Sequence, residues 1–248
     1  MKKLLCSMLV LLFPVIGFTQ EAKKEAPKKE TINSYRVFPK DGHDAALKAA
    51  ITAHVQKFHA ANWKWRVSEV LTGPDSGAYM ILEGPNSWTE LEGRGDLGSE
   101  HQKDYDTTIT PHVDKTTPTV YATYQSDVST TAPGAFAPTK TLITRVYPKP
   151  GRGAAYYASL KVWKKVWEKR GINVGVWSTF FSGEPGYILS FRLKNGWKDL
   201  DADGMGNRKA ADEVGGAGTF DRLQEEAARN IASTTSEMIE FRPELSSK

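Results

Sequence analysis

The sequence has almost no cysteine, since Cys6 is the only one in 248 residues. Cys6 lies in the apolar run from Leu4 to Phe18, which follows Lys2 and Lys3 and gives way to a charged segment. This is the pattern of a secretory signal peptide, so we expect residues 1–19 to be removed. The mature chain would then have no thiol in a compartment that permits disulfides. A cysteine nucleophile, a cysteine-ligated metal and a disulfide framework are therefore excluded.

The sequence also has little excess charge. Its formal net charge is +4, and loss of Lys2 and Lys3 with the leader would leave +2. Because such a surface attracts nucleic acid only weakly, we expect no nucleic-acid partner. Residues 20–32 are charged and nearly free of bulky apolar groups, and we interpret them as a disordered tether. The apolar run is shorter than the roughly 20 residues that a membrane-spanning helix needs. We therefore predict a protein exported to the periplasm or the cell exterior, with no membrane insertion after cleavage.

What the sequence does contain is an internal similarity. Residues 35–91 align without a gap on residues 144–200, so that RVFPKDG, which begins at Arg36, matches RVYPKPG, which begins at Arg145. A period of 109 residues is too long for a solenoid repeat and has the size of a small domain. We therefore predict two copies of one fold, a first unit at 33–127 and a second at 141–245. The linker at 128–140 is rich in serine, threonine and proline.

Each unit has the pattern of a strand, a helix, two strands, a second helix and a last strand. In the first unit, apolar side chains between Leu47 and Phe58 recur at helical spacing, and residues 65–72 and 78–83 alternate as a hairpin. Ser99, with Gln102 three residues on, predicts a capping box at the start of the second helix. Apolar side chains occur at both odd and even positions of the strands, and these positions point to opposite faces of a sheet. This predicts sheets that are buried on both faces.

This duplicated βαββαβ pattern resembles the dimeric α/β-barrel superfamily, which includes NIPSNAP-like and antibiotic-biosynthesis-monooxygenase-like proteins. The resemblance is carried by Arg-Val-aromatic-Pro-Lys on the first strand of each unit and by Trp88 or Trp197 after the third. It implies an α+β fold in which two tandem ferredoxin-like units pack sheet to sheet as an α/β barrel within one polypeptide. A fused barrel would be complete as a monomer. The resemblance does not fix an activity, because one fold hosts many functions.

The first strand of each unit offers candidate ligand-binding residues. If Val37 and Val146 face the helices, the side chains beside them face the shared interior, namely Arg36, Phe38, Arg145 and Tyr147. Two guanidinium groups there would suit a carboxylate or a phosphate. The alternative is that each arginine pairs with a strand carboxylate, since a buried arginine requires such pairing. The candidate carboxylates are those of Glu69, Glu83, Glu237 and Glu240.

The five histidines all lie in the first 112 residues. His54 belongs to the apolar stripe of the first helix, and we interpret it as a packing residue; the resemblance adds the alternative of haem iron ligation, which haem-handling members perform with a histidine. His59 follows five residues later, about 140° around a helix, so the two do not form the i, i+4 pair of a helical zinc site. We interpret His43, His101 and His112 as exposed or capping residues, because they have no cysteine or carboxylate partners at ligand spacing.

Two further features deserve a prediction. The segment DLDADG at 199–204 fits the start of a calcium loop, with Asp199, Asp201 and Asp203 as oxygen ligands, but Ala210 stands where the bidentate glutamate belongs. The alternative is an acidic helix end that runs into a glycine loop. Trp65 aligns with a valine of the second unit, and we expect it to line the mouth of the barrel cavity.

These observations favour a non-catalytic exported protein whose barrel binds a small organic or anionic ligand, or serves as a scaffold, without a resident cofactor. The first alternative is a monooxygenase-like enzyme, either cofactor-independent or haem-linked, which requires polar groups that converge on one substrate position or a bound haem. The second is a partner protein of an envelope complex, which predicts a large exposed apolar patch.

Overall fold

The computed structural model describes residues 28–134, 140–201 and 205–248. The expected leader and most of the expected tether lie outside the described residues. The first strand begins at Thr31, so the last two tether residues belong to the sheet, where Ile32 is buried. No helix in the described ranges is both long and apolar enough to cross a membrane.

The elements of the first half follow the expected order with short additions. They are β1 (Thr31–Pro39), α1 (Asp44–Phe58), β2 (Trp65–Val70), β3 (Tyr79–Asn86), α2 (Trp88–Glu92), α3 (Ser99–Asp104), a π-helical turn (Tyr105–Ile109), a 3-10 turn (Thr110–His112), β4 (Val113–Thr116) and β5 (Val120–Tyr124).

The second half repeats this order with a longer helical region. Its elements are β6 (Lys140–Pro148), α4 (Gly153–Arg170), β7 (Asn173–Ser178), β8 (Tyr187–Leu193), a 3-10 turn (Gly196–Asp201), α5 (Met205–Gly215), α6 (Thr219–Asn230), β9 (Ile231–Phe241) and a final 3-10 turn (Pro243–Leu245).

The strands of the described residues close into an antiparallel barrel. Their order is β3-β2-β9-β6-β8-β7-β5-β1, and β1 pairs again with β3, while β4 extends the end of β1. Each half has the ferredoxin-like order, β5-β1-β3-β2 in the first and β9-β6-β8-β7 in the second. The halves join edge to edge, because β2 pairs with β9 and β5 pairs with β7. The structure therefore confirms an α+β fold with an α/β barrel inside one chain.

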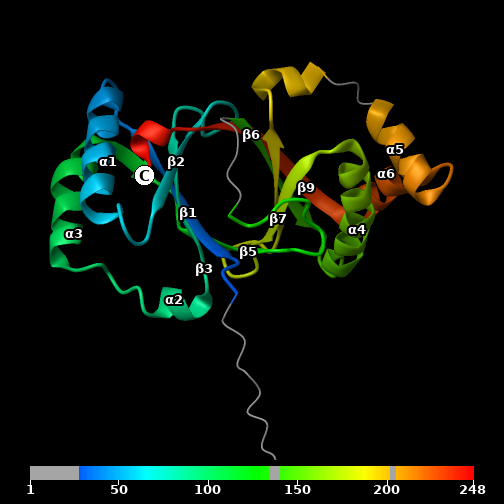
Figure 1. The fold of residues 1–248 in the computed structure, drawn as a ribbon, viewed down its shortest axis with the longest axis horizontal. Helices are drawn as coiled ribbons and strands as arrows, with labels where there is room; N and C mark the ends of the chain where they lie inside the picture. Colours follow the sequence, from blue (N-terminus) through cyan, green and yellow to red (C-terminus); the bar gives the residue numbers. More distant parts are fainter. Residues whose placement is uncertain (1–27, 135–139, 202–204) are drawn as a thin grey trace, which may run out of the picture.

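Helices cover the barrel on two opposite sides (Figure 1). The helices α1 and α3 lie on one side, and α4, α5 and α6 lie on the other. On β3, Tyr79 and Ile81 pack in the core beneath α1, whereas Met80 and Leu82 point into the barrel. Alternate side chains of the same strand thus enter two different cores, as the apolar side chains at both parities predicted.

The second helical region of the first half differs from the expectation. The N-cap of α3 is Gly98, which makes no side-chain cap, whereas the capping box of this region is formed by Ser87 and Glu90 at the start of α2. The predicted box at Ser99 is therefore wrong. After α3 the chain forms a π-helical turn and a 3-10 turn that contains Pro111, because proline cannot continue the hydrogen bonding of a helix interior.

Two connecting segments tie the halves together. The expected linker begins with Val128, which is fully buried, and the side chains of Ser129 and Thr130 accept hydrogen bonds of 2.8 Å from backbone N–H groups of β7. At the other end of the chain, Leu245 packs in the core of the first half. The backbone of Ser247 donates to the carbonyl of Trp65 at 2.9 Å, so the C-terminal segment crosses from the second half to the first.

Candidate ligand site in the barrel

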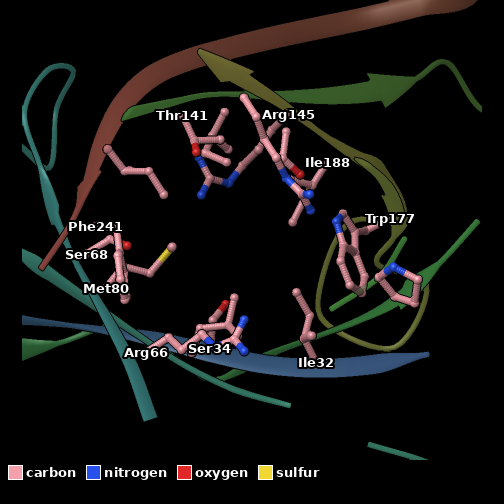
Figure 2. A pocket seen from close by; sticks show the side chains of 16 residues that line it. Ile32, Ser34, Arg66, Ser68, Met80, Thr141, Arg145, Trp177, Ile188 and Phe241 are labelled. Atoms are coloured by element: carbon pink, nitrogen blue, oxygen red, sulfur yellow. The ribbon is translucent and has the colours of Figure 1, made fainter. Parts of the chain in front are cut away.

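A cavity of about 110 Å³ lies inside the barrel, with walls from both halves. Three arginines line it, Arg66 from β2, Arg145 from β6 and Arg192 from β8. Figure 2 shows Arg66 and Arg145 on opposite sides of the space. The remaining described lining residues are apolar or carry hydroxyl groups, and none of them is a carboxylate: Ile32, Ser34, Ser68, Met80, Leu82, Pro133, Thr141, Ile143, Trp177, Ile188, Ser190, Ile239 and Phe241.

Burial destabilises the charged form of the arginines that line this cavity. Burial, and to a smaller extent the positive charge of Arg192, lowers the pKa of the Arg66 guanidinium to about 10. Burial likewise lowers the pKa of Arg192. A guanidinium with a pKa of about 10 is still charged at neutral pH. Because Arg145 shares the carboxylate of Glu237, the positive charge at the cavity wall comes chiefly from Arg66 and Arg192, in surroundings where charge is poorly solvated.

The two arginines expected from the sequence are brought together, but on a shared carboxylate. Oε1 of Glu237 accepts a hydrogen bond of 2.7 Å from Arg145 and another from Arg36, which also donates to Asp75. This is the strand-carboxylate pairing that we set against an anion site. Arg36 is absent from the lining of the 110 Å³ cavity, whereas Arg145 borders it.

The flanking residues lie as the strand alternation predicts. Val37 packs in the core beneath α1 and Val146 in the core beneath α4. Phe38 packs against an apolar cluster inside the barrel, and the ammonium of Lys115 lies 4.5 Å from the centre of its ring. Tyr147 lines a separate small hollow next to Arg145. Neither aromatic ring borders the arginine cavity.

Sequence reasoning did not identify Arg66 or Arg192. The candidate arginines were those repeated at the 109-residue offset. At this offset Arg66 aligns with Gly175 and Arg192 with Glu83, so neither arginine is repeated. The only sequence signal for these two arginines is weaker than a repeat. Each is a charged residue inside a strand with an apolar residue directly before and after it, and such a residue either pairs with an acid or borders a cavity.

The remaining sequence candidates lie outside the barrel. His54 and Trp65 come together in the layer between α1 and the sheet, away from the barrel mouth where we expected Trp65. Asp199 accepts hydrogen bonds from the backbone and the side chain of Asn195, at 3.1 and 2.8 Å. Asp201 ends the same 3-10 turn, and Asp203 lies outside the described residues. The structure thus shows both oxygens of Asp199 in use at a turn.

Comparison with known proteins bears on the fold. No family model matches the chain, and no curated protein does. Among solved structures, a candidate monooxygenase from Fusobacterium nucleatum superposes with a TM-score of 0.57 at 14% identity, covering 85% of this chain and 91% of that one. The chain has the dimeric α/β-barrel fold. An anthrone oxidase-like protein shares this barrel with a TM-score of 0.54 at 14% identity, covering 87% and 92% of the two chains.

A mutant chlorite dismutase from Candidatus Nitrospira defluvii also has this barrel, with a TM-score of 0.55 at 9% identity over 86% of this chain and 92% of that one. The family resemblance suggests haem as a possible ligand, but the residues of the barrel cavity do not fit a haem. Its 110 Å³ is well below the roughly 300–1,000 Å³ of pockets for drug-sized ligands. Of the residue types that ligate haem iron, Met80 alone is among the described lining residues. Nε2 of His54 lies 3.2 Å from the ring of His101, which leaves no room for a macrocycle.

Proposed function

We propose that the protein is an exported binding protein, without catalytic activity, whose barrel takes a small organic anion. The observation that carries this proposal is the cavity inside the barrel, whose described lining includes three arginines and no carboxylate. A carboxylate or a phosphate is the partner that a guanidinium binds with the best geometry, through two parallel hydrogen bonds. Such an anion would add a charged partner at the cavity wall to those that the arginines already have, as Glu237 is for Arg145.

The apolar part of the lining limits the ligand further. Trp177, Ile188 and Met80 border the same space as the arginines, and Ser68 and Ser190 add hydroxyl groups. A ligand with a short hydrocarbon or aromatic group next to its charge would bury that group against these side chains. The volume of about 110 Å³ favours a molecule of a few heavy atoms. Because the barrel closes within one chain, this role requires no second copy.

The composition of the lining supports binding over catalysis. General acid–base catalysis needs a group that exchanges a proton near the working pH, most often histidine or a carboxylate. The described lining has neither, and Arg66, with a pKa of about 10, keeps its proton at neutral pH. The serine hydroxyls have no adjacent base in this lining to activate them.

Two alternatives have specific support. The names of several solved neighbours favour a monooxygenase-like enzyme, although they share only the fold with this chain. A shifted Soret band on addition of haemin would favour that alternative. For a partner protein, the supporting feature is a small exposed aromatic patch of Trp88, Tyr121 and Phe181, and nothing in the structure shows what would cover it.

The proposal is tested by ligand-dependent stabilisation of the mature protein. Acetate, propionate, benzoate and inorganic phosphate would be compared with acetamide and benzamide, which have similar shapes but no charge. A ligand at 100 times its Kd stabilises the folded state by roughly 2.7 kcal/mol, which a thermal melt detects readily. We expect at least one anion to raise the Tm and the matched amide to have no effect.

Two variants test whether the anion that raises the Tm binds inside the barrel. Arg192→Met should abolish the stabilisation by the anion, whereas Arg208→Met, which removes an exposed partner of Asp221, should leave it unchanged. If no anion raises the Tm at millimolar concentration, or if Arg192→Met responds as the wild type does, the proposed role of the cavity is wrong.

A further inference from the structure

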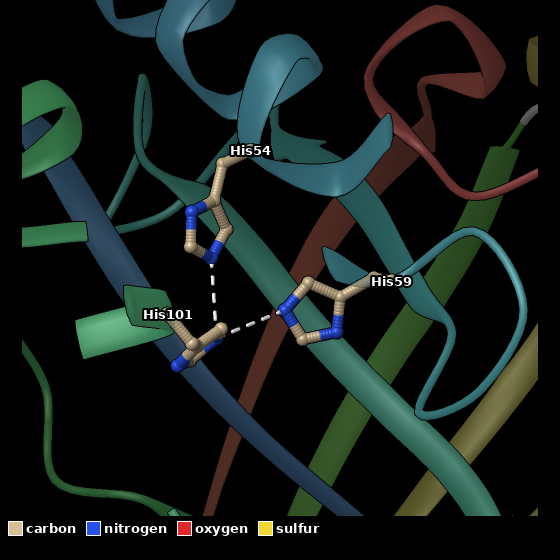
Figure 3. A group of neighbouring side chains, drawn as sticks. All are labelled: His54, His59 and His101. Carbon is tan, nitrogen blue, oxygen red and sulfur yellow. Dashed lines mark hydrogen bonds between the residues drawn. The ribbon is translucent and has the colours of Figure 1, made fainter. Parts of the chain in front are cut away.

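Three histidines converge in the layer between the helices and the sheet of the first half (Figure 3). His54 comes from α1, His59 from the residue after its end, and His101 from α3. Nε2 of His101 lies 3.2 Å from Nε2 of His54 and 3.2 Å from Nε2 of His59. One nitrogen of each ring lies within 4.8 Å of the others, and all three side chains are buried. This cluster is separate from the barrel cavity.

The outer nitrogens decide where the protons are. Nδ1 of His54 lies 2.9 Å from Oδ2 of Asp104, and Nδ1 of His59 lies 2.7 Å from the carbonyl of Trp63. Both partners are acceptors, so each Nδ1 must carry the hydrogen. In the neutral rings, Nε2 of His54 and Nε2 of His59 are therefore lone pairs, and both face His101.

A neutral His101 cannot fully satisfy this arrangement. If its Nε2 carries the hydrogen, its Nδ1 becomes a buried acceptor, and no hydrogen bond to Nδ1 is formed within the described residues. If instead its Nδ1 carries the hydrogen, which the nearby backbone of Asp96 favours, three lone pairs point at one another. A cation between the rings removes this conflict, because it binds all three lone pairs at once.

Two of the three nitrogen–nitrogen separations match a transition-metal ion, and the third, between His54 and His59 and within 4.8 Å, would have to shorten on binding. Zinc–nitrogen bonds of about 2.0–2.1 Å in a tetrahedral site place two ligand nitrogens roughly 3.3–3.4 Å apart. The two separations of 3.2 Å at His101 are close to this value. Three neutral imidazoles with no thiolate suit Zn²⁺ and the neighbouring divalent ions.

The three rings bind a metal in their neutral form, and the groups around them do not add a large net charge. The nearest charged groups largely balance, since Lys57 pairs with Asp104 and Arg94 pairs with Glu83.

The surrounding chain fixes the ligands in place. Trp63 has a left-handed backbone with φ of 51°, which is uncommon for a bulky residue, and its carbonyl is the acceptor for His59. Strain of this kind is often found at functional sites. The indole of Trp65 stacks on the ring of His59 at 4.1 Å between centroids. Asp104 holds the ring of His54 as carboxylates hold metal-binding histidines in known sites.

We propose that His54, His59 and His101 bind one divalent transition-metal ion through their Nε2 atoms, with Zn²⁺ as the best match. Asp104 and the carbonyl of Trp63 are positioning groups. Three histidine ligands leave the fourth tetrahedral position to water. The second half has no histidine, so the expected stoichiometry is one ion per chain.

The test uses untagged mature protein, stripped with a chelator and then loaded with Zn²⁺ or Co²⁺. We expect one ion per chain by elemental analysis, a rise in Tm on Zn²⁺ loading, and the intense visible bands of tetrahedral Co²⁺. His59→Gln and His101→Gln should lose the Co²⁺ bands and weaken Zn²⁺ binding by more than 100-fold. Asp104→Asn should keep the three ligands and weaken binding by roughly 10–100-fold.

His112→Gln is the matched control. His112 lies with its Nδ1 3.0 Å from Nδ1 of His43, a pair outside the three-histidine cluster, so this variant should bind as the wild type does. Wild-type protein that retains much less than one Zn²⁺ per chain, or that gives the spectrum of hydrated Co²⁺, would refute the site even if a histidine variant failed to fold. Equal binding by folded wild type and folded His59→Gln would refute it as well.

Discussion

Glu237 joins the two halves of the barrel through charge, and its removal should strongly destabilise the fold. The residue lies on β9 with 5% of its surface exposed, and its Oε1 accepts from Arg145 of β6 and from Arg36 of β1. Glu237→Gln keeps the shape of the side chain but removes the negative charge that two guanidinium groups share. Breaking a buried ion pair costs roughly 3–5 kcal/mol. Because Asp75 still accepts from Arg36, we expect the lower end, about 3 kcal/mol.

Urea and thermal unfolding measure this loss directly. For chains of 150–250 residues, 1 kcal/mol shifts the Tm by roughly 2–4 °C, so the variant should melt about 6–12 °C below the wild type. Glu240→Gln is the control, because Glu240 is more exposed than Glu237 and pairs with Lys140 and Arg242, so its loss should cost less. A loss below about 1 kcal/mol for Glu237→Gln, or one equal to that of the control, would refute the claim that this carboxylate joins the halves.

Three further outcomes follow from the packing. Leu245→Ala should lose about 2–4 kcal/mol in urea unfolding, because Leu245 is 3% exposed in the core of the first half. Gly84→Ala should destabilise more than Gly95→Ala in thermal melts: both have positive φ, but a Cβ at Gly84 would lie 2.7 Å from the carbonyl oxygen of Thr31, whereas Gly95 faces open space. Asp44 has a lowered pKa, chiefly through its hydrogen bond with Lys48, so its contribution to stability exists at neutral pH and is lost as the pH falls below the ordinary carboxyl pKa. Asp44→Asn should therefore unfold more easily than the wild type at pH 7, by less than about 1 kcal/mol, and the difference should vanish in acid.

The fold could be predicted because its signal is spread along each strand. A ferredoxin-like sheet with one wet face would show apolar residues at one parity only. The apolar residues at both parities of β3 required a second core, and the interior of the barrel is that core. Val37 and Val146 then fixed which side of each first strand faces the helices. The face to which a strand residue points depends only on its position in that strand, so this prediction requires no knowledge of residues far along the chain.

The contents of the cavity could not be predicted in the same way. Arg36 and Arg145 look alike in the sequence, and both bind Glu237, about ninety residues beyond Arg145, yet of these two only Arg145 also borders the cavity. Which arginine meets which carboxylate depends on the pairing of β9 with β6, and that pairing is settled only when the barrel closes. The closing of the barrel also places Arg66 and Arg192 in the wall of the cavity.

The histidine cluster was missed for a local geometric reason. A helix that continued past Phe58 would place His59 about 140° from His54, but α1 ends at Phe58. His59 has φ of −118° and ψ of 12°, so its side chain leaves the helical path and turns toward His54. His101 arrives from α3, 42 residues further on, and it is buried where we expected an exposed or capping residue.

The aligned position in the second half shows why these rings are hard to explain as packing alone. Where the first half has His54, the second has Trp163, and Trp163 stacks against Trp167 at 6.3 Å between centroids in an apolar layer. An indole fills that layer with a single N–H to satisfy, whereas three imidazoles bring six nitrogens, and burying an unpaired polar group costs roughly 1–3 kcal/mol. If packing were the only role, apolar side chains at the three histidine positions should preserve or raise stability. If an ion is bound, the same substitutions should remove the stabilisation that Zn²⁺ confers, and thermal melts with and without chelator separate the two cases.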